Sequence, residues 1–300
     1  MPSGTDPPST PRRVRIVAVA NQKGGVGKTT TAVNLATALA AKGEPVLLID
    51  LDPQGNASMG FGFTRDAKTR GTYHLLSGES SLADATHETF VPNLTLIPSD
   101  IDLAGAEVEL VGEQRREFRL RDALAPLRTG GPGGFIIVDC PPSLGLLTLN
   151  ALVAAHSVLV PLQCEFYALS GIGALMHTVD MIRRRLNPGL RVEGIVLTMH
   201  DRRQSLSELV AEDARGVFGD LVYTTVIPRN VRVSEAPSHG KPVLLYDFRS
   251  PGSQAYVRLA AEMLERQRGG TDGRAGGAAP GGMSPGGTSP GGTSPGGAPS

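Results

Sequence analysis

The chain has 300 residues, of which 40% are hydrophobic, so it can bury a large core, and α/β folds of this size often form one domain. Lysine plus arginine and aspartate plus glutamate balance at 29 each, which excludes a global positive field as the means of attracting nucleic acid and leaves only a local patch. Two cysteines, Cys140 and Cys164, are too few for a disulfide framework or a four-thiolate metal site, and they fit a reducing cytosol.

Both ends of the chain have the composition of disordered segments. Residues 1–13 are rich in Pro, Ser and Thr, and they lack the charged start and apolar segment of a secretory signal. Residues 269–300 contain Gly-Gly-Met/Thr-Ser-Pro repeats with almost no apolar side chains, which cannot offset their ordering entropy. No apolar run reaches the roughly 18 residues of a membrane helix. We therefore expect a soluble protein with one ordered domain over residues 14–268.

The ordered part begins with a strand, a glycine-rich loop, a helix and a second strand. Residues 14–20 form a short segment rich in β-branched side chains, as in a buried parallel strand. Residues 45–50 have the same character. Residues 30–42 have apolar side chains at helical spacing, and Gly43 is well placed to end that helix in a left-handed conformation. This order predicts a right-handed crossover, with ligands bound at the carboxyl ends of the strands.

Strand and helix patterns then alternate to the end of the domain. Further strands are predicted over residues 94–97, 135–139, 157–162, 192–198 and 221–227. Further helices are predicted over residues 107–127, 146–155, 172–186, 205–218 and 253–268. The alternation predicts an α/β fold with a mostly parallel, doubly wound sheet flanked by helices.

Residues 20–27, the phosphate loop, have the composition of a nucleotide site. Gly25 and Gly27 allow successive backbone N–H groups to point at an anion. Lys28 can neutralise the β- and γ-phosphates, and the hydroxyl of Thr29 can bind Mg²⁺. The helix that starts near Thr29 adds its positive dipole end beneath the phosphates.

Aspartates at two strand ends are expected near these phosphates. Asp52 follows the second strand, where a carboxylate can orient or deprotonate the attacking water; the alternative is that it only caps the turn at Pro53. Asp139 ends an apolar strand, which suits a residue that holds hydrated Mg²⁺ through water, although a strand-terminal cap is the alternative. Asp50 is predicted to be structural or to lie next to Mg²⁺.

The phosphate loop departs from the usual pattern, because Gln22 stands where a glycine is normal and Lys23 adds a second lysine. Residues 23–29, Lys-Gly-Gly-Val-Gly-Lys-Thr, match the deviant Walker A loop of the partition and cell-division ATPases. With Asp-Leu-Asp-Pro-Gln at residues 50–54 and Asp-Cys-Pro-Pro at residues 139–142, the chain closely resembles the ParA/Soj chromosome-partitioning branch. The resemblance covers roughly residues 13–268 and implies a P-loop ATPase that uses ATP and Mg²⁺.

The resemblance also implies roles that spacing alone does not indicate. Lys23 would reach across a nucleotide-sandwich homodimer to the phosphates of the opposite subunit; the alternative is that it serves its own loop. Gly24 would face the partner subunit, and Pro228 and Asn230 would contact the adenine base. The candidate catalytic residues are then Asp52, Lys23 and Lys28. The candidate ATP-binding residues are Lys23, Gly24, Gly25, Val26, Gly27, Lys28, Thr29, Thr30, Pro228 and Asn230.

Arginines are concentrated between residues 183 and 203, which is usually a solvated face. The resemblance favours nonspecific binding of double-stranded DNA instead, with Arg203 as the first candidate, followed by Arg232 and Arg202. In proteins of this kind the ATP-bound homodimer holds DNA, and a ParB-type centromere-binding partner stimulates hydrolysis. The implied function is segregation of a chromosome or plasmid, in the cytoplasm at the nucleoid and without a membrane.

Three alternatives belong to other functional classes. A MinD-like membrane-positioning protein shares the deviant loop but needs a C-terminal amphipathic basic helix, whereas here residues 256–268 are followed by a Gly/Pro tail. An iron–sulfur-dependent relative needs paired bridging cysteines. A ParA-like adaptor would position a cargo other than DNA.

Overall fold

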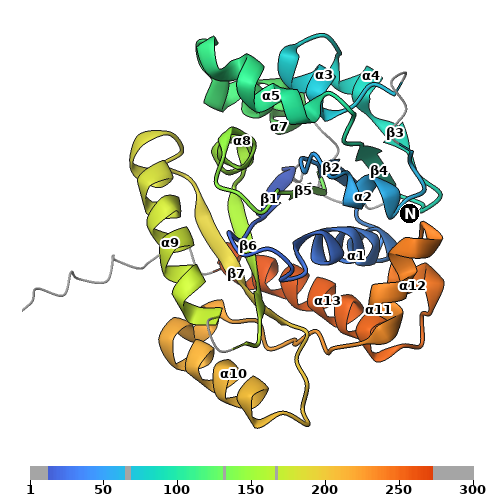
Figure 1. Cartoon of the computed structure of the whole chain (residues 1–300), viewed down its shortest axis with the longest axis vertical. Helices are drawn as coiled ribbons and strands as arrows, with labels where there is room; N and C mark the ends of the chain where they lie inside the picture. The colour runs from blue at the N-terminus through green and yellow to red at the C-terminus, as the bar shows by residue number, and fades with distance from the viewer. Residues whose placement is uncertain (1–12, 65–68, 131–132, 166–167, 273–300) are drawn as a thin grey trace, which may run out of the picture. The chain divides into compact units, whose positions relative to one another are not determined.

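A computed structural model of the chain describes residues 13–64, 69–130, 133–165 and 168–272 (Figure 1). The chain forms two compact units that divide after Leu264. The first unit contains the whole sheet and the helices that cover it, and the described part of the second is the end of helix α13 (Pro251–Asp272). This helix continues past residue 268, where the sequence pattern ends it. Apart from Arg13 and residues 269–272, the segments predicted to be disordered lie outside the described residues.

A seven-stranded sheet forms the centre of the first unit within the described residues, with the order β3-β4-β2-β5-β1-β6-β7. The strands are β1 (Arg15–Val19), β2 (Val46–Asp50), β3 (His87–Glu88), β4 (Leu94–Ile97), β5 (Phe135–Asp139), β6 (Ser157–Gln163) and β7 (Arg191–Thr198). The short β3 is antiparallel to β4, and the other pairs are parallel, so the prediction of a mostly parallel sheet is confirmed. Strand β1, the first in the chain, lies between β5 and β6.

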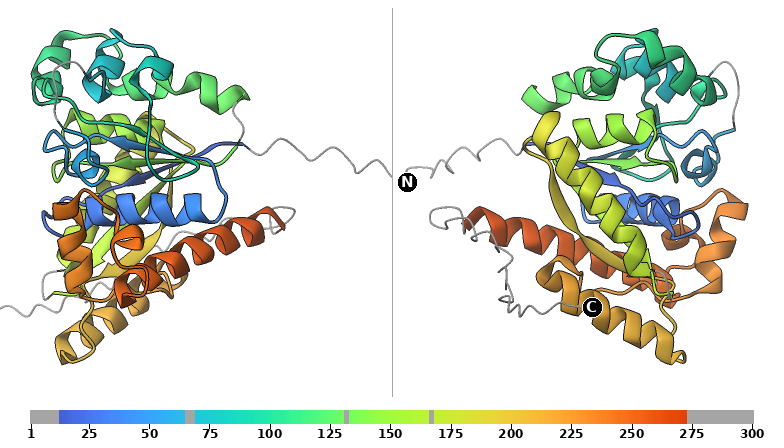
Figure 2. Two further views of the ribbon diagram at one scale, coloured as in Figure 1. Left: turned by 90° about the vertical axis from the view of Figure 1, so that its right-hand side faces the viewer. Right: turned by 60° about the vertical axis from the view of Figure 1, so that its left-hand side comes forward.

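Helices cover both faces of the sheet, as the doubly wound prediction requires. Helices α1 (Lys28–Ala41) and α13 pack on one face together with Val17 and Val19. Helices α8 (Leu146–Ala154), α9 (Ala168–Arg185) and α10 (Ser205–Phe218) pack on the other face. Figures 1 and 2 show α1 and α8 on opposite sides of the strands. Alternate residues of β1 enter the two cores, and this burial on both faces explains its continuous apolar run.

Short helices make up the rest of the described fold. They are α2 (Asn56–Met59), α3 (Thr72–Ser77), α4 (Leu82–Ala85), α5 (Leu103–Glu109), α6 (Arg119–Ala123), α7 (Ala125–Gly130), α11 (Val231–Glu235) and α12 (Val243–Tyr246). None of the helices in the described ranges combines the length and the apolar character needed to cross a bilayer.

The predicted helix over residues 107–127 is wrong, because the segment is broken into α5, two 3₁₀ turns, α6 and α7. Arg115 adopts a left-handed conformation with φ of 57°, which a continuous helix cannot contain. Val108 and Val111 are exposed, with 77% and 60% of their surface accessible, so the apolar spacing here does not mark a buried face. Packing of α6 against α8 replaces the continuous helix, with the Leu120 N–H donating to the side chain of Asn150.

The predicted strand over residues 221–227 is also wrong as a regular element. The segment runs beside β7, where the N–H groups of Tyr223 and Ile227 donate to carbonyls of that strand. Between these two bonds, however, the N–H groups of Thr224 and Thr225 both donate to the carboxylate of Glu262 on α13. The ladder is therefore interrupted by a carboxylate, and only an isolated bridge at Val222 remains.

Acidification is expected to destabilise this sheet through His156. Its Nδ1 accepts a hydrogen bond of 2.9 Å from the Ile16 N–H at the start of β1, and burial lowers its pKa from 6.5 to about 4. The His156 ring binds a proton more readily in the unfolded chain than in the folded one. The contribution of neutral His156 to the free energy of unfolding is therefore fully present above about pH 6.5 and is lost as the pH falls towards 4. We expect a loss of at most about 2 kcal/mol in denaturant titrations between pH 7 and pH 4.5, because the ring is partly solvated. His156→Asn keeps an acceptor without this titration, and an unchanged pH dependence in that variant would contradict the assignment.

Candidate functional site

The phosphate loop connects the carboxyl end of β1 to the first turn of α1. Gly25 and Gly27 have φ of 75° and 84°, a region that suits glycine, and Gly27 is the N-cap of α1 without a side-chain cap. The loop is supported from beneath by Asn21, whose amide donates to the Pro161 carbonyl at 2.8 Å and accepts from the Lys23 N–H at 3.0 Å. Because Gly27 offers no side-chain cap, the N–H groups in the first turn of α1 are available to bind an anion.

Lys28 is buried at the base of the loop, with 7% of its surface accessible. Its ammonium donates to the Lys23 carbonyl at 2.9 Å. Burial lowers the pKa of Lys28, whereas the nearby carboxylates of Asp139 and Asp52 act in the opposite direction. A buried cation at a helix N-terminus is suited to binding a polyanion, as predicted for the β- and γ-phosphates.

Asp139 ends β5 beside the phosphate loop and is fully buried. Neither of its carboxylate oxygens makes a hydrogen bond within the described residues. Burial raises its pKa well above the ordinary value, and Asp50 adds to this effect, while Thr29 and Lys28 oppose it. A buried carboxylate with two unsatisfied oxygens beside the Thr29 hydroxyl fits the hydration shell of a Mg²⁺ ion, because Mg²⁺ prefers oxygen ligands and retains several waters.

Asp52 begins the loop between β2 and α2 and is buried, with 6% of its surface accessible. Its Oδ1 accepts from the Gln54 N–H at 2.9 Å, which fixes the turn at Pro53 and leaves Oδ2 without a hydrogen-bond partner among the described residues. The capping role and a role at the nucleotide are therefore compatible. Asp50 is buried behind it. Burial raises the pKa of Asp50 to about 6, although the hydrogen bonds from Ser58 and Asp52 act in the opposite direction.

A cavity of about 630 Å³ brings these elements together, a volume typical of small-ligand sites. Of the predicted residues, it is lined by Gly24, Gly25, Gly27, Lys28, Thr29, Thr30 and Asp52. A larger cavity of about 810 Å³ lies at the opposite end of the sheet, around the beginnings of β2, β4 and β5. Among its described lining residues Glu88 is the charged one, so that cavity offers a phosphate no cationic side chain.

The cavity wall also includes the segment from Ala236 to Val243. Its first three residues, through Ser238, are the end of the stretch that by resemblance contacts the adenine base. It is attached to α1, because Asn34 accepts a hydrogen bond of 2.8 Å from the Val243 N–H. Pro237 and Pro242 lie near the two ends of this segment. The predicted base-binding residues lie just before it and outside the lining: Asn230 caps α11 by accepting from the Val233 N–H at 3.3 Å, and Pro228 pairs with His200. Their role remains a prediction.

Lys23 forms an ion pair at the surface of the single chain. Its ammonium lies 3.1 Å from the carboxylate of Glu165, which follows β6, and 41% of its side chain is accessible. The two lysines of the loop therefore have different environments, one buried at the cavity and one at the surface. An exposed ion pair of this kind contributes little to stability, so Lys23 can exchange its partner at small cost.

The candidate DNA-contacting arginines are exposed, and two of them are paired with carboxylates. Arg203 makes a two-pronged contact with Asp201 at 2.9 and 2.8 Å, and its hydrogen bonds lower the pKa of Asp201 to about 2. Arg232 lies 2.9 Å from Glu235 and 3.5 Å from Asp247. Arg202 is exposed. Local pairing reduces the positive field at both sites, so phosphate would have to compete with these carboxylates.

The loop that carries Arg203 also touches the phosphate loop. The hydroxyl of Thr198, at the end of β7, donates to the Val26 carbonyl at 2.9 Å. Met199 lines the cavity and has φ of 52°, an uncommon conformation for a residue other than glycine. Three residues of the chain therefore separate Met199, in the wall of the cavity, from Arg203.

Comparisons with known proteins agree with this arrangement. The AAA domain family model matches residues 14–192. The chain is 59% identical to the chromosome partitioning protein ParA of Caulobacter vibrioides over 255 residues, which are 85% of this chain and 96% of that protein. It is 51% identical over 249 residues to the sporulation initiation inhibitor protein Soj of Bacillus subtilis, covering 83% of this chain and 98% of that protein.

Solved structures with the same fold carry nucleotide. A protein from Mycobacterium smegmatis, described as cobyrinic acid a,c-diamide synthase with bound ADP and magnesium, is 39% identical with a TM-score of 0.74, covering 86% of this chain and 96% of that one. The septum site-determining protein MinD of Pyrococcus horikoshii, solved with Mg-ADP, is 26% identical with a TM-score of 0.69, covering 85% of this chain and 98% of that one.

Proposed function

The chain belongs to the ParA/Soj family of chromosome-partitioning ATPases, and from this premise we propose that it binds Mg²⁺ and ATP in the cavity beside α1 and uses hydrolysis to drive chromosome segregation. The observation that carries the proposal is that buried Lys28, the first residue of α1, and the buried carboxylate of Asp139, the last residue of β5, lie near each other beside the phosphate loop. The ParA relatives at 59% identity outweigh the synthase at 39% as a guide to this activity.

The Mg²⁺ ion would be held by the hydroxyl of Thr29 directly and by Asp139 through water. When bound, it neutralises charge on the β- and γ-phosphate oxygens. The amides of the phosphate loop and the ammonium of Lys28 bind the same oxygens from the protein side. Lys28 would release the Lys23 carbonyl to do so, and phosphate is the stronger acceptor because it is charged.

Asp52 supplies the group that acts on water. Its free Oδ2 would accept a proton from the water that attacks the γ-phosphorus, while Gln54 keeps Oδ1 in place. The bond from the γ-phosphorus to the bridging oxygen breaks, and ADP and inorganic phosphate leave. Lys23 would exchange Glu165 for the phosphates of a second subunit, which makes the nucleotide part of a homodimer interface.

The ATP-bound homodimer would hold double-stranded DNA without sequence preference. The DNA phosphates would be contacted from both subunits by Arg203, Arg232 and Arg202. Because the two patches act together only in the ATP-bound dimer, DNA affinity depends on the nucleotide state. A ParB-type partner would stimulate hydrolysis and release the dimer. The proposed location is the cytoplasm, at the nucleoid.

DNA retention measured with ATP, ADP and no nucleotide across a salt series tests this function, and only the ATP state should bind. Arg203→Glu should weaken binding about tenfold at low salt and flatten its salt dependence, because each lost phosphate contact lowers the slope by about one. Asp201→Asn should strengthen binding, because it frees Arg203 from a charged competitor. Arg121→Glu, on α6, is the charge-matched control. Equal binding in all three nucleotide states would contradict the proposed switch.

A further inference from the structure

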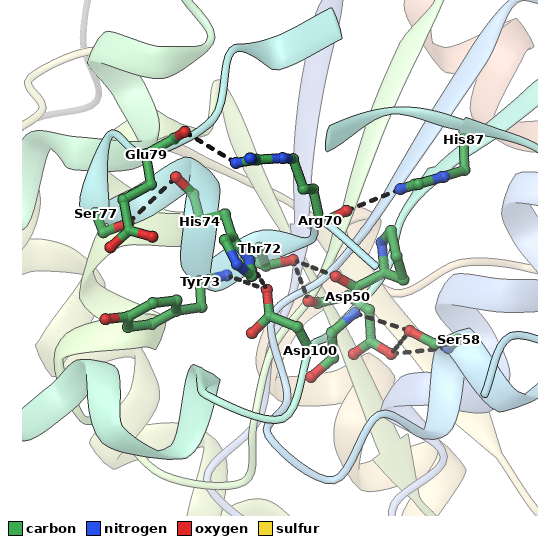
Figure 3. A network of polar contacts seen from close by, with 12 residues as sticks. Asp50, Ser58, Arg70, Thr72, Tyr73, His74, Ser77, Glu79, His87 and Asp100 are labelled. Atoms are coloured by element: carbon green, nitrogen blue, oxygen red, sulfur yellow. Dashed lines mark hydrogen bonds and ion pairs between the residues drawn. The ribbon is translucent and has the colours of Figure 1, made fainter. Parts of the chain in front are cut away.

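Asp50, the last residue of β2, has a buried carboxylate whose two oxygens both accept hydrogen bonds from neighbouring donors. Its Oδ2 accepts from the N–H of Ser58 at 2.8 Å and from the hydroxyl of Ser58 at 2.6 Å. Its Oδ1 accepts from the Asp52 N–H at 3.2 Å. Figure 3 shows Ser58 pointing at Asp50 from the neighbouring helix. No part of the Asp50 side chain is accessible, and it does not line the cavity.

Ser58 is a junction between Asp50 and the next strand. Its hydroxyl donates to Asp50 and accepts from the Ser99 N–H, 2.9 Å away, just after β4. The Thr72 hydroxyl donates to the backbone carbonyl of Asp50 at 2.7 Å, which fixes the end of β2 as well (Figure 3). The carboxylate, the hydroxyl and the backbone groups around them are thus mutually satisfied. A network of this kind holds a single geometry, because each broken bond would leave a buried polar group without a partner.

The two residues that donate to the Asp50 carboxylate lie at the two ends of one segment. Asp52 begins the segment 52–58 and Ser58 lies in α2 at its far end. The same segment forms a wall of the cavity through Asp52, Gln54 and Asn56. Asp50 therefore holds the two ends of this loop together on its buried side, while the opposite side of the loop faces the nucleotide site.

We propose that Asp50 and Ser58 are positioning residues for ATP hydrolysis, which close the 52–58 loop and thereby aim the carboxylate of Asp52 at the attacking water. The inference rests on the proposed function, because it concerns the role of Asp52 given there. Nucleotide affinity comes from other residues, namely the phosphate loop and Lys28. A loosened loop should therefore slow the chemical step and leave binding nearly intact. A displacement of about 1 Å at a reacting group can cost about a hundredfold in rate.

Ser58→Ala is the sharpest test, with Ser99→Ala as its matched control. The control removes a buried serine hydroxyl that has no hydrogen-bond partner within the described residues, and it keeps the backbone N–H that Ser58 uses. Mg·ATP affinity is measured with a fluorescent ATP analogue, and hydrolysis is measured in single turnover with excess protein. We expect Ser58→Ala to lower the single-turnover rate at least about tenfold with affinity changed less than about threefold. Ser99→Ala should match the unmodified chain in both measurements.

Two further variants separate positioning from simple support of the fold. Ser58→Thr keeps the hydroxyl and should recover most of the rate. Asp50→Asn replaces one acceptor oxygen by a donor that faces another donor, so it should slow hydrolysis as Ser58→Ala does. Hydrolysis at the normal rate in Ser58→Ala and Asp50→Asn would overturn the inference. So would a proportional loss of rate and affinity together with a lowered melting temperature. Normal turnover in Asp52→Ala would instead refute the proposed function itself.

Discussion

Replacing Lys28 by alanine is expected to weaken Mg·ATP binding by at least about a hundredfold. The cavity holds few cations: of the residues described around it, Lys28 and Lys241 carry positive charge, and Lys241 is exposed. Lys28 is buried, so its ammonium acts where charge is poorly screened. Removing one member of a buried charge pair costs about 3 to 5 kcal/mol, which corresponds to two or more orders of magnitude in affinity.

Titration calorimetry at fixed Mg²⁺ measures this loss, and a thermal melt establishes that the variant is folded. Lys42→Ala, at the other end of α1 and exposed, is the control for removing a lysine from this helix. Binding within threefold of the unmodified chain would mean that Lys28 is not the phosphate ligand. The nucleotide would then have to lie elsewhere in the cavity.

Replacing Asp52 by alanine is expected to lower the single-turnover rate of hydrolysis by at least about a hundredfold, because general base catalysis contributes 10²- to 10⁴-fold. Affinity for Mg·ATP should change only a few-fold, since the amides and Lys28 that bind the phosphates stay in place. Asp52→Asn should be equally slow: its amide oxygen can still accept from Gln54, but the group cannot take a proton from water.

Light scattering on the same variant with saturating Mg·ATP should report dimers, because hydrolysis no longer dissolves the interface. Asp102→Ala removes an exposed carboxylate outside the cavity and serves as the control. Persistent monomers would refute the nucleotide-dependent dimer. Normal hydrolysis in both Asp52 variants would show that another residue activates the water.

Much of the architecture follows from local sequence patterns. The strands β1, β2, β4 and β5 have short β-branched runs because both of their faces are buried, and this pattern has few alternatives. Gly43, predicted to end the first helix, does adopt a left-handed conformation with φ of 86°. The phosphate loop was predictable for a similar reason, since glycines beside lysine and threonine satisfy a demanding geometry.

The misassigned segments fail where tertiary contacts override local preference. Residues 221–227 have the composition of a strand, but Glu262 takes two of the N–H groups that a strand would use. No pattern near residue 224 indicates a carboxylate on a distant helix. In residues 107–127, good helix-forming side chains obscure the reversal at Arg115.

The site divides in the same way. Residues proposed to contact the nucleotide directly, such as Lys28 and Thr29, belong to a sequence motif that can be recognised one residue at a time. The closing contact between Asp50 and Ser58 depends on the shape of the loop between them and becomes visible only in three dimensions. The wall from Ala236 to Val243 is similar, because its position depends on how it attaches to Asn34 of α1.

The central place of β1 has a consequence for biosynthesis. Its phosphate loop is among the first parts of the domain to leave the ribosome, yet β1 pairs with residues 135–139 and 157–159, which are made much later. The loop therefore has no neighbouring strands until residues 135–159 have been made. ATP cannot stabilise an unfinished chain, because its binding site is not yet formed. Once the unit is folded, bound ATP stabilises all of it, by an amount that grows with the logarithm of ligand concentration. Truncated chains ending before residue 157 should consequently be substrates for chaperones or proteases rather than weak nucleotide binders.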